Sequence, residues 1–263
     1  MLEVRTLASG SSGNCLLVRG GGSQVLVDAG ISCRRIVNAL RELEVEPREL
    51  TGVLITHEHA DHIAGLATLT RQYRLPVYAS RGTGWELCRR IAFVEEVLRP
   101  FEPGEAFQAG DLEAVSFPTS HDAAQSVGYV LSHGGKRAAV ATDLGHVTAE
   151  VARAVRGADL LVCEANHDVE WVRSNGRYPY PLKARILGDR GHLSNEAGAE
   201  LAWTAVEGGA RAVVLAHLSH ENNTPARALE VVGGVLARRG AAVGREVVLE
   251  AAPRSETGRA YRL

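Results

Sequence analysis

Three histidines and one aspartate stand within the short segment Thr56–His62. The apolar run directly before it is typical of a buried strand, and because alternate strand residues share a face, His57 and His59 point to one side. The chain then turns into a helix, which brings Asp61 and His62 back toward the same point. Converging imidazole nitrogens and a carboxylate are ligands that Zn²⁺ and similar ions take. The alternative, a surface turn rich in histidine, is disfavoured by so many ligand side chains in so few positions.

Further ligands are expected at the ends of other strands. His121, Asp143 and His217 each follow a short apolar run, where a polar side chain sits at the tip of a predicted buried strand. Together with the first cluster they complete a site for two metal ions, without any cysteine. The most economical arrangement places His57, His59 and His121 on one ion, Asp61, His62 and His217 on the other, and Asp143 between them as a bridge.

The elements that must position these residues are short strands interleaved with helices. Runs rich in Val, Leu and Ala predict strands at Cys15–Val18, Gln24–Val27, Gly52–Thr56, Leu112–Phe117, Ser126–Leu131, Arg137–Thr142, Leu160–Glu164, Ala212–Ala216 and Glu246–Glu250. Helical spacing predicts helices at Ser32–Leu43, Ala60–Tyr73, Gly84–Ala92, Thr148–Arg156, Asn195–Glu207 and Thr224–Gly240. The stretch Val172–Gly191, with two prolines, is expected to be a long functional loop. We expect an α/β fold with a sheet-on-sheet core, helices outside, and one domain over residues 1–263.

The composition is that of a globular protein with a real core, since 45% of the 263 residues are hydrophobic and 23% are charged. No apolar run reaches the length of a membrane span, and Met1–Gly13 lacks the features of a secretory signal. The formal net charge of −2 gives no argument for bulk affinity to nucleic acid or membranes. Four scattered cysteines without a C-x-x-C pair favour reduced, mostly buried thiols in a cytoplasmic protein.

The metal-ligand residues, in this order, resemble the metallo-β-lactamase superfamily. The segment Thr56–His62 matches its H-x-H-x-D-H signature, and His121, Asp143 and His217 follow in the order of its later ligand motifs. Asp28 stands where that family keeps a structural aspartate that braces the signature loop. The resemblance covers nearly the whole chain and implies a four-layer αββα sandwich with a dinuclear site at one edge. Because members hydrolyse lactams, thioesters and phosphodiesters, the fold alone does not fix the reaction.

Departures from two branches of this family narrow the reaction. Asp143 stands where the common dizinc β-lactamases carry cysteine, which disfavours lactam hydrolysis. Glyoxalase-II-like thioesterases add a C-terminal helical region with basic residues, whereas this chain ends in a strand and the short tail Glu250–Leu263. The nuclease-like branch adds a histidine with a nearby glutamate, which His192 and Glu164 resemble.

A more local resemblance is to YycJ-type proteins. They carry a turn rich in glycine and serine near the N-terminus, here Ser9–Asn14, and share the segments Gly191–Asn195 and Ala216–Ser219. That group is associated with 5′-to-3′ exonuclease-like action on DNA. The resemblance therefore implies a dinuclear metal-dependent phosphodiester hydrolase that acts as a 5′-to-3′ exonuclease on single-stranded DNA or another nucleic acid.

Three residues are expected to take part in catalysis at such a site. Asp61, as a ligand and hydrogen-bond acceptor, orients the hydroxide that two cations activate. His192 gives a proton to the leaving oxygen while Glu164 holds its ring, although a place at a helix N-terminus is the alternative for His192. Zn²⁺ is the first expectation for both ions, and Mn or Fe fit the same ligands.

Other residues are expected to bind the substrate. Backbone donors of the N-terminal turn would cradle a phosphate, unless the turn is only a hairpin corner. The expected substrate-binding residues are Ser11, Ser12, Gly13, Asn14, Ser194 and Asn195. The stretch Trp171–Arg190 interleaves cationic and aromatic residues that would follow a nucleic-acid strand, or else form a solvated basic face. The remaining histidines, His133, His146, His167 and His220, are expected at the surface or in helix caps.

Two other functions stay open at this level. One is a hydrolase with a small substrate, either a phosphodiesterase or a glyoxalase-II-like thioesterase. The other is a nucleic-acid-binding module that keeps a vestigial metal site. The exonuclease function implied by the resemblance makes nucleic acid the expected partner and involves no membrane.

Overall fold

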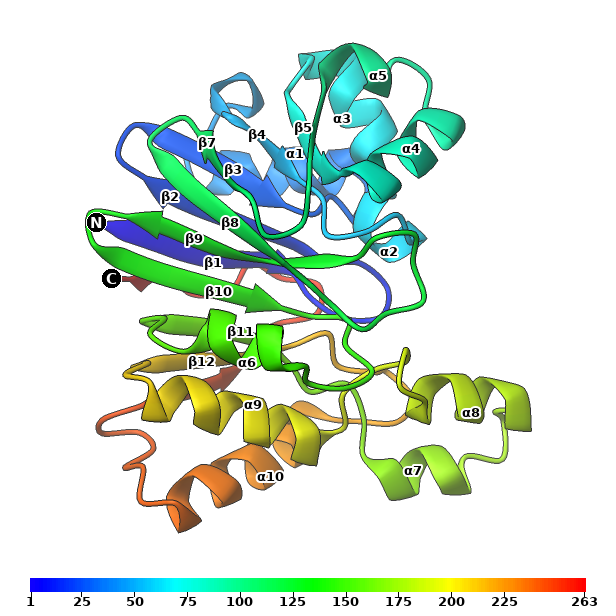
Figure 1. The fold of residues 1–263 in the computed structure, drawn as a ribbon, viewed down its shortest axis with the longest axis vertical. Helices are drawn as coiled ribbons and strands as arrows, with labels where there is room; N and C mark the ends of the chain where they lie inside the picture. The colour runs from blue at the N-terminus through cyan, green and yellow to red at the C-terminus, as the bar shows by residue number, and fades with distance from the viewer.

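The computed structural model describes residues 1–263, which form two seven-stranded sheets packed face to face. Helices cover the outer face of each sheet, so the order of layers is helices, sheet, sheet, helices (Figure 1). This is the four-layer αββα sandwich expected from the sequence. The two termini lie close together, because β14 (Tyr261–Arg262) pairs with β1 (Leu2–Ala8).

Sheet A holds the N-terminal strands and the last strand of the chain. Its spatial order is β14, β1, β2 (Cys15–Gly20), β3 (Ser23–Val27), β4 (Gly52–Leu54), β5 (Val77–Ser80) and β6 (Leu98–Phe101). The strands from β3 to β6 run parallel. On its outer side lie α1 (Cys33–Glu42), α3 (Leu66–Tyr73), α4 (Arg81–Arg90) and α5 (Val94–Val97), while a 3₁₀ helix (Pro47–Glu49) and α2 (Ala60–Ile63) lie in the connections.

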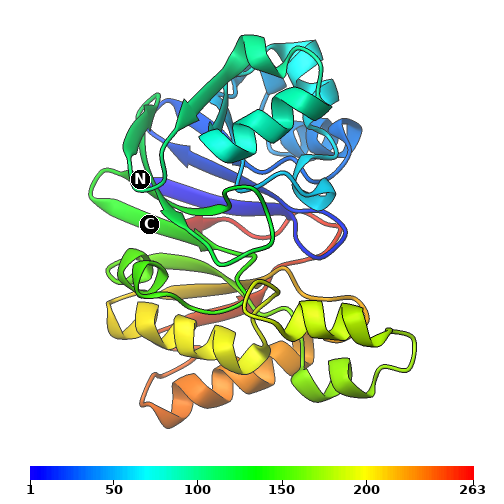
Figure 2. The same cartoon turned by 45° about the vertical axis from the view of Figure 1, so that its right-hand side comes forward.

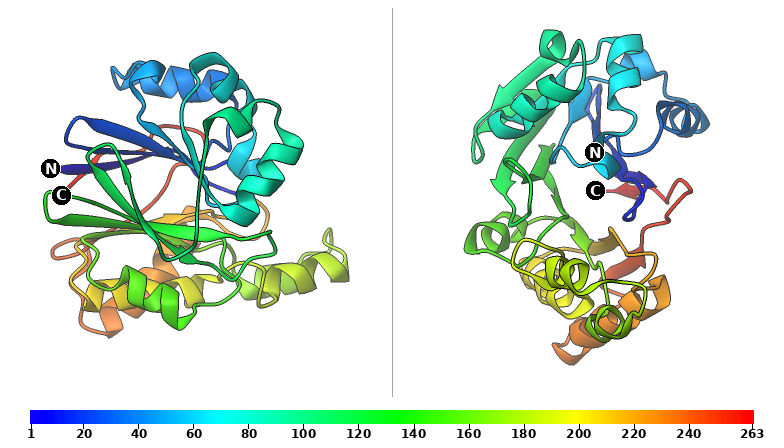
Figure 3. Two further views of the ribbon diagram at one scale, coloured as in Figure 1. Left: turned by 45° about the horizontal axis from the view of Figure 1, so that its top comes forward. Right: turned by 90° about the vertical axis from the view of Figure 1, so that its right-hand side faces the viewer.

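Sheet B has the order β13 (Val248–Ala251), β12 (Ala212–Ala216), β11 (Leu160–Glu164), β10 (Lys136–Ala141), β9 (Val127–His133), β8 (Leu112–Pro118) and β7 (Ala106–Ala109). The strands from β10 to β13 run parallel. Its outer face is covered by α6 (Ala149–Val155), α9 (Asn195–Glu207) and α10 (Pro225–Arg238), with α9 and α10 side by side (Figure 2). Two further helices, α7 (Val169–Ser174) and α8 (Tyr180–Leu187), extend from this layer (Figure 3).

Both faces of each sheet are buried, which explains why so many strands are continuous apolar runs. In β11, Leu160 and Val162 point into the core between the sheets, whereas Leu161 and Cys163 point into the core under the helices. This alternation follows from the two-residue period of a strand. The three cores contain 24, 24 and 23 buried residues, so each of the three interfaces between layers is a full apolar core.

The carboxyl ends of the parallel strands of both sheets meet at one edge of the sandwich. The residues that directly follow or end these strands include Asp28 after β3, Asp143 beyond β10, Glu164 at the end of β11 and His217 after β12. Ligand sites of α/β folds commonly lie at this edge of a sheet. The hydroxyl of Tyr129 on β9 donates to the carbonyl of Ile55 at a distance of 2.6 Å and links the two sheets just before the histidine-rich segment.

Several expected elements differ in the structure. The single helix expected over Ala60–Tyr73 is two helices, because the chain breaks at Gly65, where an added Cβ would lie 2.3 Å from the carbonyl oxygen of Ile31. The expected loop Val172–Gly191 contains α8 and the end of α7, since Pro181 sits in the first turn of α8, where no backbone N–H is needed. Strands β1, β5, β6 and β7 and helix α5 were not among the expected elements.

Candidate metal centre

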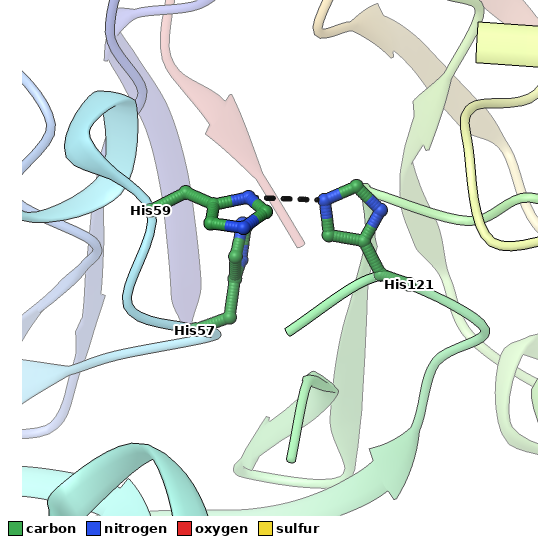
Figure 4. A group of neighbouring side chains, drawn as sticks. All are labelled: His57, His59 and His121. Atoms are coloured by element: carbon green, nitrogen blue, oxygen red, sulfur yellow. Dashed lines mark hydrogen bonds between the residues drawn. The ribbon is translucent and has the colours of Figure 1, made fainter. Parts of the chain in front are cut away.

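The first candidate ligand group comprises His57, His59 and His121. The first two lie on the turn after β4, and His121 lies beyond the end of β8 on the opposite sheet. Their ligand nitrogens all lie within 4.8 Å of one another, and Nδ1 of His59 is 3.2 Å from Nε2 of His121. The rings of His57 and His59 come from one segment and converge on the ring of His121, which comes from another (Figure 4).

The second group comprises Asp61, His62 and His217, whose ligand atoms also lie within 4.8 Å of one another. Oδ2 of Asp61 is 3.2 Å from Nε2 of His217 and 3.5 Å from Nε2 of His62. Helix α2 is only four residues long, and it turns Asp61 and His62 back over the end of β4. The structure therefore brings together both triads that the sequence suggested.

Asp143 lies between the two groups. Its Oδ2 is 3.3 Å from Nε2 of His62. Its Oδ1 is 3.6 Å from Nε2 of His217 and 3.7 Å from Nε2 of His121. One carboxylate thus reaches members of both triads, which is the position a bridging ligand requires.

Two buried atoms of this cluster have no hydrogen-bond partner, namely Nε2 of His57 and Oδ2 of Asp143. A buried polar atom without a partner is costly, and native structures rarely leave one without a reason. Both atoms belong to candidate ligand groups. Divalent cations would satisfy both atoms, so the donor set fits the metal ions that the family implies.

The charges around the site divide the histidines into two kinds. Burial and the neighbouring histidines lower the pKa of His57, and burial lowers the pKa of His121. Burial opposes protonation of His217 as well, but Asp143 and Asp61 outweigh it and raise its pKa to about 10. The same hydrogen bonds, from His217 and His62, outweigh burial and hold the pKa of Asp61 well below its usual range. The carboxylates thus attract positive charge to this point, as a cation site must.

Asp28 supports the turn from below. Its carboxylate accepts hydrogen bonds from the backbone N–H of Thr56 at 2.8 Å and from Nδ1 of His62 at 2.7 Å. The Thr56 hydroxyl, which also contacts Asp28, lies 3.1 Å from Nδ1 of His57. By accepting the Nδ1 proton of His62, Asp28 fixes the orientation of that ring, and Nε2 faces Asp61 and Asp143 in the site.

Glu164 plays the corresponding part on sheet B. It is completely buried, and Oε1 lies 2.9 Å from Nδ1 of His217 and 2.8 Å from Nδ1 of His192. Its other oxygen accepts the backbone N–H groups of Leu144 and Leu193. Burial raises the pKa of a carboxyl group, but the contacts with His192 and His217 outweigh this and lower the pKa of Glu164. Sequence reasoning paired Glu164 with His192 alone, and the structure adds His217.

Three of the six non-glycine residues with a positive φ lie at the same edge. Asp28, Asp143 and His217 have backbone φ values of 63°, 59° and 55°, which residues other than glycine rarely adopt. Each follows closely on a strand end and turns its side chain into the site. Such conformations cost on the order of 1 kcal/mol or more and persist where function requires them.

The N-terminal turn packs against the metal centre. The Ser9 hydroxyl accepts the backbone N–H of His217 at 2.9 Å, and the backbone N–H of Asn14 donates to the carbonyl of Asp61 at 2.8 Å. This approach needs glycine at position 30, because an added Cβ would lie 1.7 Å from the Asp61 carbonyl oxygen.

Three of the expected substrate-binding residues make side-chain contacts within the protein. Asn195 is completely buried and exchanges side-chain hydrogen bonds with Asn223, so it has no atom for a substrate. Ser194 caps α9 by accepting the N–H of Ala197. Asn14 is buried, bonds the backbone of Gly10, and places its Nδ2 3.2 Å from Nε2 of the candidate ligand His62. Ser11 and Ser12 are exposed on the turn, whereas Gly13 is buried.

Three side chains line the open side of the site. His59, Asp61 and His192 are 28%, 26% and 20% exposed, whereas His57, His62, His121, Asp143 and His217 are almost fully buried. A substrate therefore meets these three side chains first. The bond from Nδ1 of His192 to Glu164 leaves Nε2 of His192 as the free ring atom.

Sequence reasoning missed two polar neighbours of the ligands. Oδ1 of Asp122 lies 3.4 Å from Nε2 of His121, and Nδ2 of Asn166 donates to the carbonyl of His217 at 2.8 Å. Their positions in the sequence could have indicated them, because Asp122 directly follows His121 and Asn166 lies just beyond β11. The expectation for His167 was wrong. His167 is 1% exposed, and its backbone forms an isolated parallel β-bridge with Ser194, two residues after His192.

Comparison with known proteins agrees with this geometry. Residues 23–218 match the Beta-lactamase superfamily domain. The chain belongs to this superfamily. It is similar to exodeoxyribonuclease YycJ of Bacillus anthracis, with 39% identity over 247 residues and 92% of each chain covered. It is also similar to exodeoxyribonuclease WalJ of Streptococcus pneumoniae, with 41% identity over 221 residues, 82% of this chain and 81% of the relative.

Solved structures of the superfamily share the whole fold. The metallo-β-lactamase fold protein YhfI of Bacillus subtilis aligns over 100% of both chains with a TM-score of 0.75 at 17% identity. Zn²⁺-bound PqqB of Methylobacterium extorquens aligns with a TM-score of 0.72 at 18% identity, over 99% of this chain and 100% of its own. These likenesses establish the metallo-β-lactamase fold. No helix of this chain is long and apolar enough to cross a membrane.

Replacing Asp28 tests its role in holding the superfamily ligand His62. We expect Asp28→Asn to weaken metal binding by about 10- to 100-fold, because loss of the carboxylate frees the ring orientation. The measurement is competition with a chromogenic chelator. Asp111→Asn is the matched control, since Asp111 is an exposed aspartate that also accepts a backbone N–H, that of Gly22. Equal affinities for the two variants would contradict this role for Asp28.

Burial of His167 predicts a specific loss of stability in acid. Burial lowers its pKa from 6.5 to about 4, so below pH 6.5 the unfolded chain takes up a proton that the folded chain refuses. The free energy of unfolding then falls by about 1.4 kcal/mol per pH unit toward pH 4 from this group. Urea denaturation of chelator-treated protein at several pH values should show a shallower decline for His167→Gln. Parallel declines in both proteins would refute the assignment.

Proposed function

We propose that this chain is a dinuclear metal-dependent phosphodiesterase that degrades single-stranded DNA from its 5′ end. The observation that carries the proposal is the Asp143 carboxylate, which lies between two complete ligand triads. The two relatives named exodeoxyribonucleases, similar over most of their length, support DNA as the substrate. The enzyme class is therefore a hydrolase of the metallo-β-lactamase fold.

Seven residues would hold the two metal ions. They are His57, His59 and His121 for one ion, Asp61, His62 and His217 for the other, and Asp143 for both. When bound, two such ions would supply Lewis acidity, which lowers the pKa of water and offsets charge on phosphoryl oxygens. We propose Zn²⁺ as the resident ion from the imidazole-rich donor set, and the same ligands accept Mn or Fe.

The side chains on the open face would move the protons. Asp61 Oδ2 faces His62 and His217, which leaves its other oxygen to accept a hydrogen bond from the attacking water. His192, held through Nδ1 by Glu164, would donate the proton of Nε2 to the leaving oxygen. Because Glu164 also holds His217, one buried carboxylate sets the distance between the acid and the metal ligands.

The exposed residues Ser11 and Ser12 are proposed to bind a phosphate beside the ligands through their backbone N–H groups, since those of Gly13 and Asn14 already bond Gly10 and Asp61. Their turn is fixed to His217 through Ser9 and to Asp61 through Asn14, so it holds its position relative to the centre. We also propose that the protein acts in the cytoplasm, where its free cysteines stay reduced.

The alternatives have less support. A vestigial site would be expected to have lost ligands, yet the seven candidate ligands lie close together here. The similarity to a hydroxyacylglutathione hydrolase, a thioesterase of the glyoxalase II type, covers 40% of this chain, whereas the similarity to exodeoxyribonuclease YycJ covers 92%. Digestion of a 5′-phosphorylated oligodeoxynucleotide labelled at its 3′ end, compared with hydrolysis of bis(p-nitrophenyl) phosphate, separates them. We expect stepwise shortening of the oligonucleotide and at least 100-fold less activity in Asp143→Ala. Binding without any shortening by metal-loaded protein would refute the proposal.

His192→Ala tests the division between acid and ligands. The variant should keep wild-type metal content and lose about 100-fold or more in kcat, the usual contribution of a general acid. Metal content by mass spectrometry and single-turnover cleavage measure the two effects. His220→Ala, which removes an exposed histidine, is the control and should behave as wild type. Metal loss in His192→Ala would make His192 a ligand instead.

A further inference from the structure

Helix α8 contributes no buried residue to the protein. Helices in proteins owe most of their stability to packing of an apolar face, yet this one leaves Tyr180 82% exposed and Leu187 37% exposed. With α7 it forms an extension of residues 169–191, here called the arm, which reaches beyond the helical layer (Figures 1 and 3). The arm therefore presents a surface that the fold itself does not use.

The arm is cationic in a chain that is not. It holds five cationic side chains against two acids, a net charge of +3, whereas the whole chain carries −2. Two of the five, Arg177 and Arg185, pair with Glu221 and Asp122 outside the arm. Lys183 has no acidic partner, and its ammonium group donates to the carbonyl of Arg173 at 2.7 Å. Arg173 itself pairs on the surface with Glu170. An exposed pair of this kind is weak and leaves the guanidinium able to bind an anion.

The aromatic and cationic side chains face the same hollow. A cavity of about 420 Å³ between α7 and α8 is lined by Arg173, Tyr180, Lys183, Ala184 and Leu187. Four of these lining positions recur at a spacing of three or four residues and so lie on one face of α8. An aromatic ring beside unpaired positive charge is the combination with which proteins hold single-stranded nucleic acid.

The arm is joined directly to the rim of the metal centre. Arg185 forms two hydrogen bonds with Asp122, at 2.6 and 3.2 Å, and Asp122 lies next to the ligand His121. Arg190 donates to the carbonyl of His121, and the backbone N–H of His192 donates to Ile186 of α8. A nucleic-acid strand that leaves the metal centre on this side would therefore pass onto the arm.

We propose that the arm is the binding surface for the single-stranded part of the nucleic acid beyond the metal centre. The ring of Tyr180 stacks on a base, and Lys183 and Arg173 contact the phosphates. The inference rests on the proposed function for its substrate class. It predicts that the arm contributes to binding of long substrates and not to the chemical step.

Two variants and a control test the arm. Tyr180→Ala removes the ring and Lys183→Gln removes the charge, while Trp85→Ala removes an aromatic side chain that is 62% exposed on α4, away from the arm. Fluorescence anisotropy of a labelled oligo-dT of about 20 nucleotides, on chelator-treated protein, measures binding without turnover. Steady-state kinetics on the same oligonucleotide and on bis(p-nitrophenyl) phosphate follow with metal-loaded protein.

Tyr180→Ala should raise both Kd and KM for the oligonucleotide by about 10-fold, with kcat and small-diester hydrolysis unchanged. Lys183→Gln should weaken binding and flatten its salt dependence, and Trp85→Ala should match wild type. Wild-type Kd in both arm variants would overturn the inference, as would a dimer that Tyr180→Ala dissociates without a change in Kd. A third outcome separates the two proposals. If the wild-type protein binds the oligonucleotide, Tyr180→Ala weakens this binding, and the metal-loaded wild-type protein does not digest the oligonucleotide, the arm is supported and the proposed function is refuted.

Discussion

Mutual compensation of charge at one edge of the sandwich is the constraint on which the functional end of this protein depends. Four carboxylates and six imidazoles converge there, namely Asp28, Asp61, Asp143 and Glu164 with His57, His59, His62, His121, His192 and His217. Buried carboxylates and crowded imidazoles are each unfavourable alone. Asp28 holds Nδ1 of His62 and Glu164 holds Nδ1 of His217, so Nε2 of both rings is directed toward the candidate cation positions.

The rest of the fold positions these side chains close together. Three apolar cores fix the strand ends, and the strained residues after β3, β10 and β12 turn inward from them. The Ser9 hydroxyl reaches the N–H of His217, 208 positions away, so the first turn of the chain closes the site made by its last ligand. Stability in the cores offsets the local cost of the strained turns.

The convergence of the candidate ligands could be predicted from sequence because His121, Asp143 and His217 each follow a buried strand, and His57 to His62 form one compact motif. Residues whose role depends on distant partners could not. The burial of His167 and the pairing of Asn195 with Asn223 come from tertiary contacts that local pattern does not carry. Strand β1 was missed because Glu3 interrupts its apolar pattern, and this residue is buried only through Arg19 and Arg262. The prolines around α8 indicated a loop, although Pro181 suits a first helical turn.

The proposed chemistry depends on one carboxylate, that of Asp143, being shared by two cations. Anomalous diffraction from a crystal of the protein loaded with Mn²⁺ or Zn²⁺ measures this. We expect two peaks in each chain, one against the His57, His59 and His121 nitrogens and one against Asp61, His62 and His217, with Asp143 in contact with both. A single peak, or two peaks of which one lies away from Asp143, would contradict it.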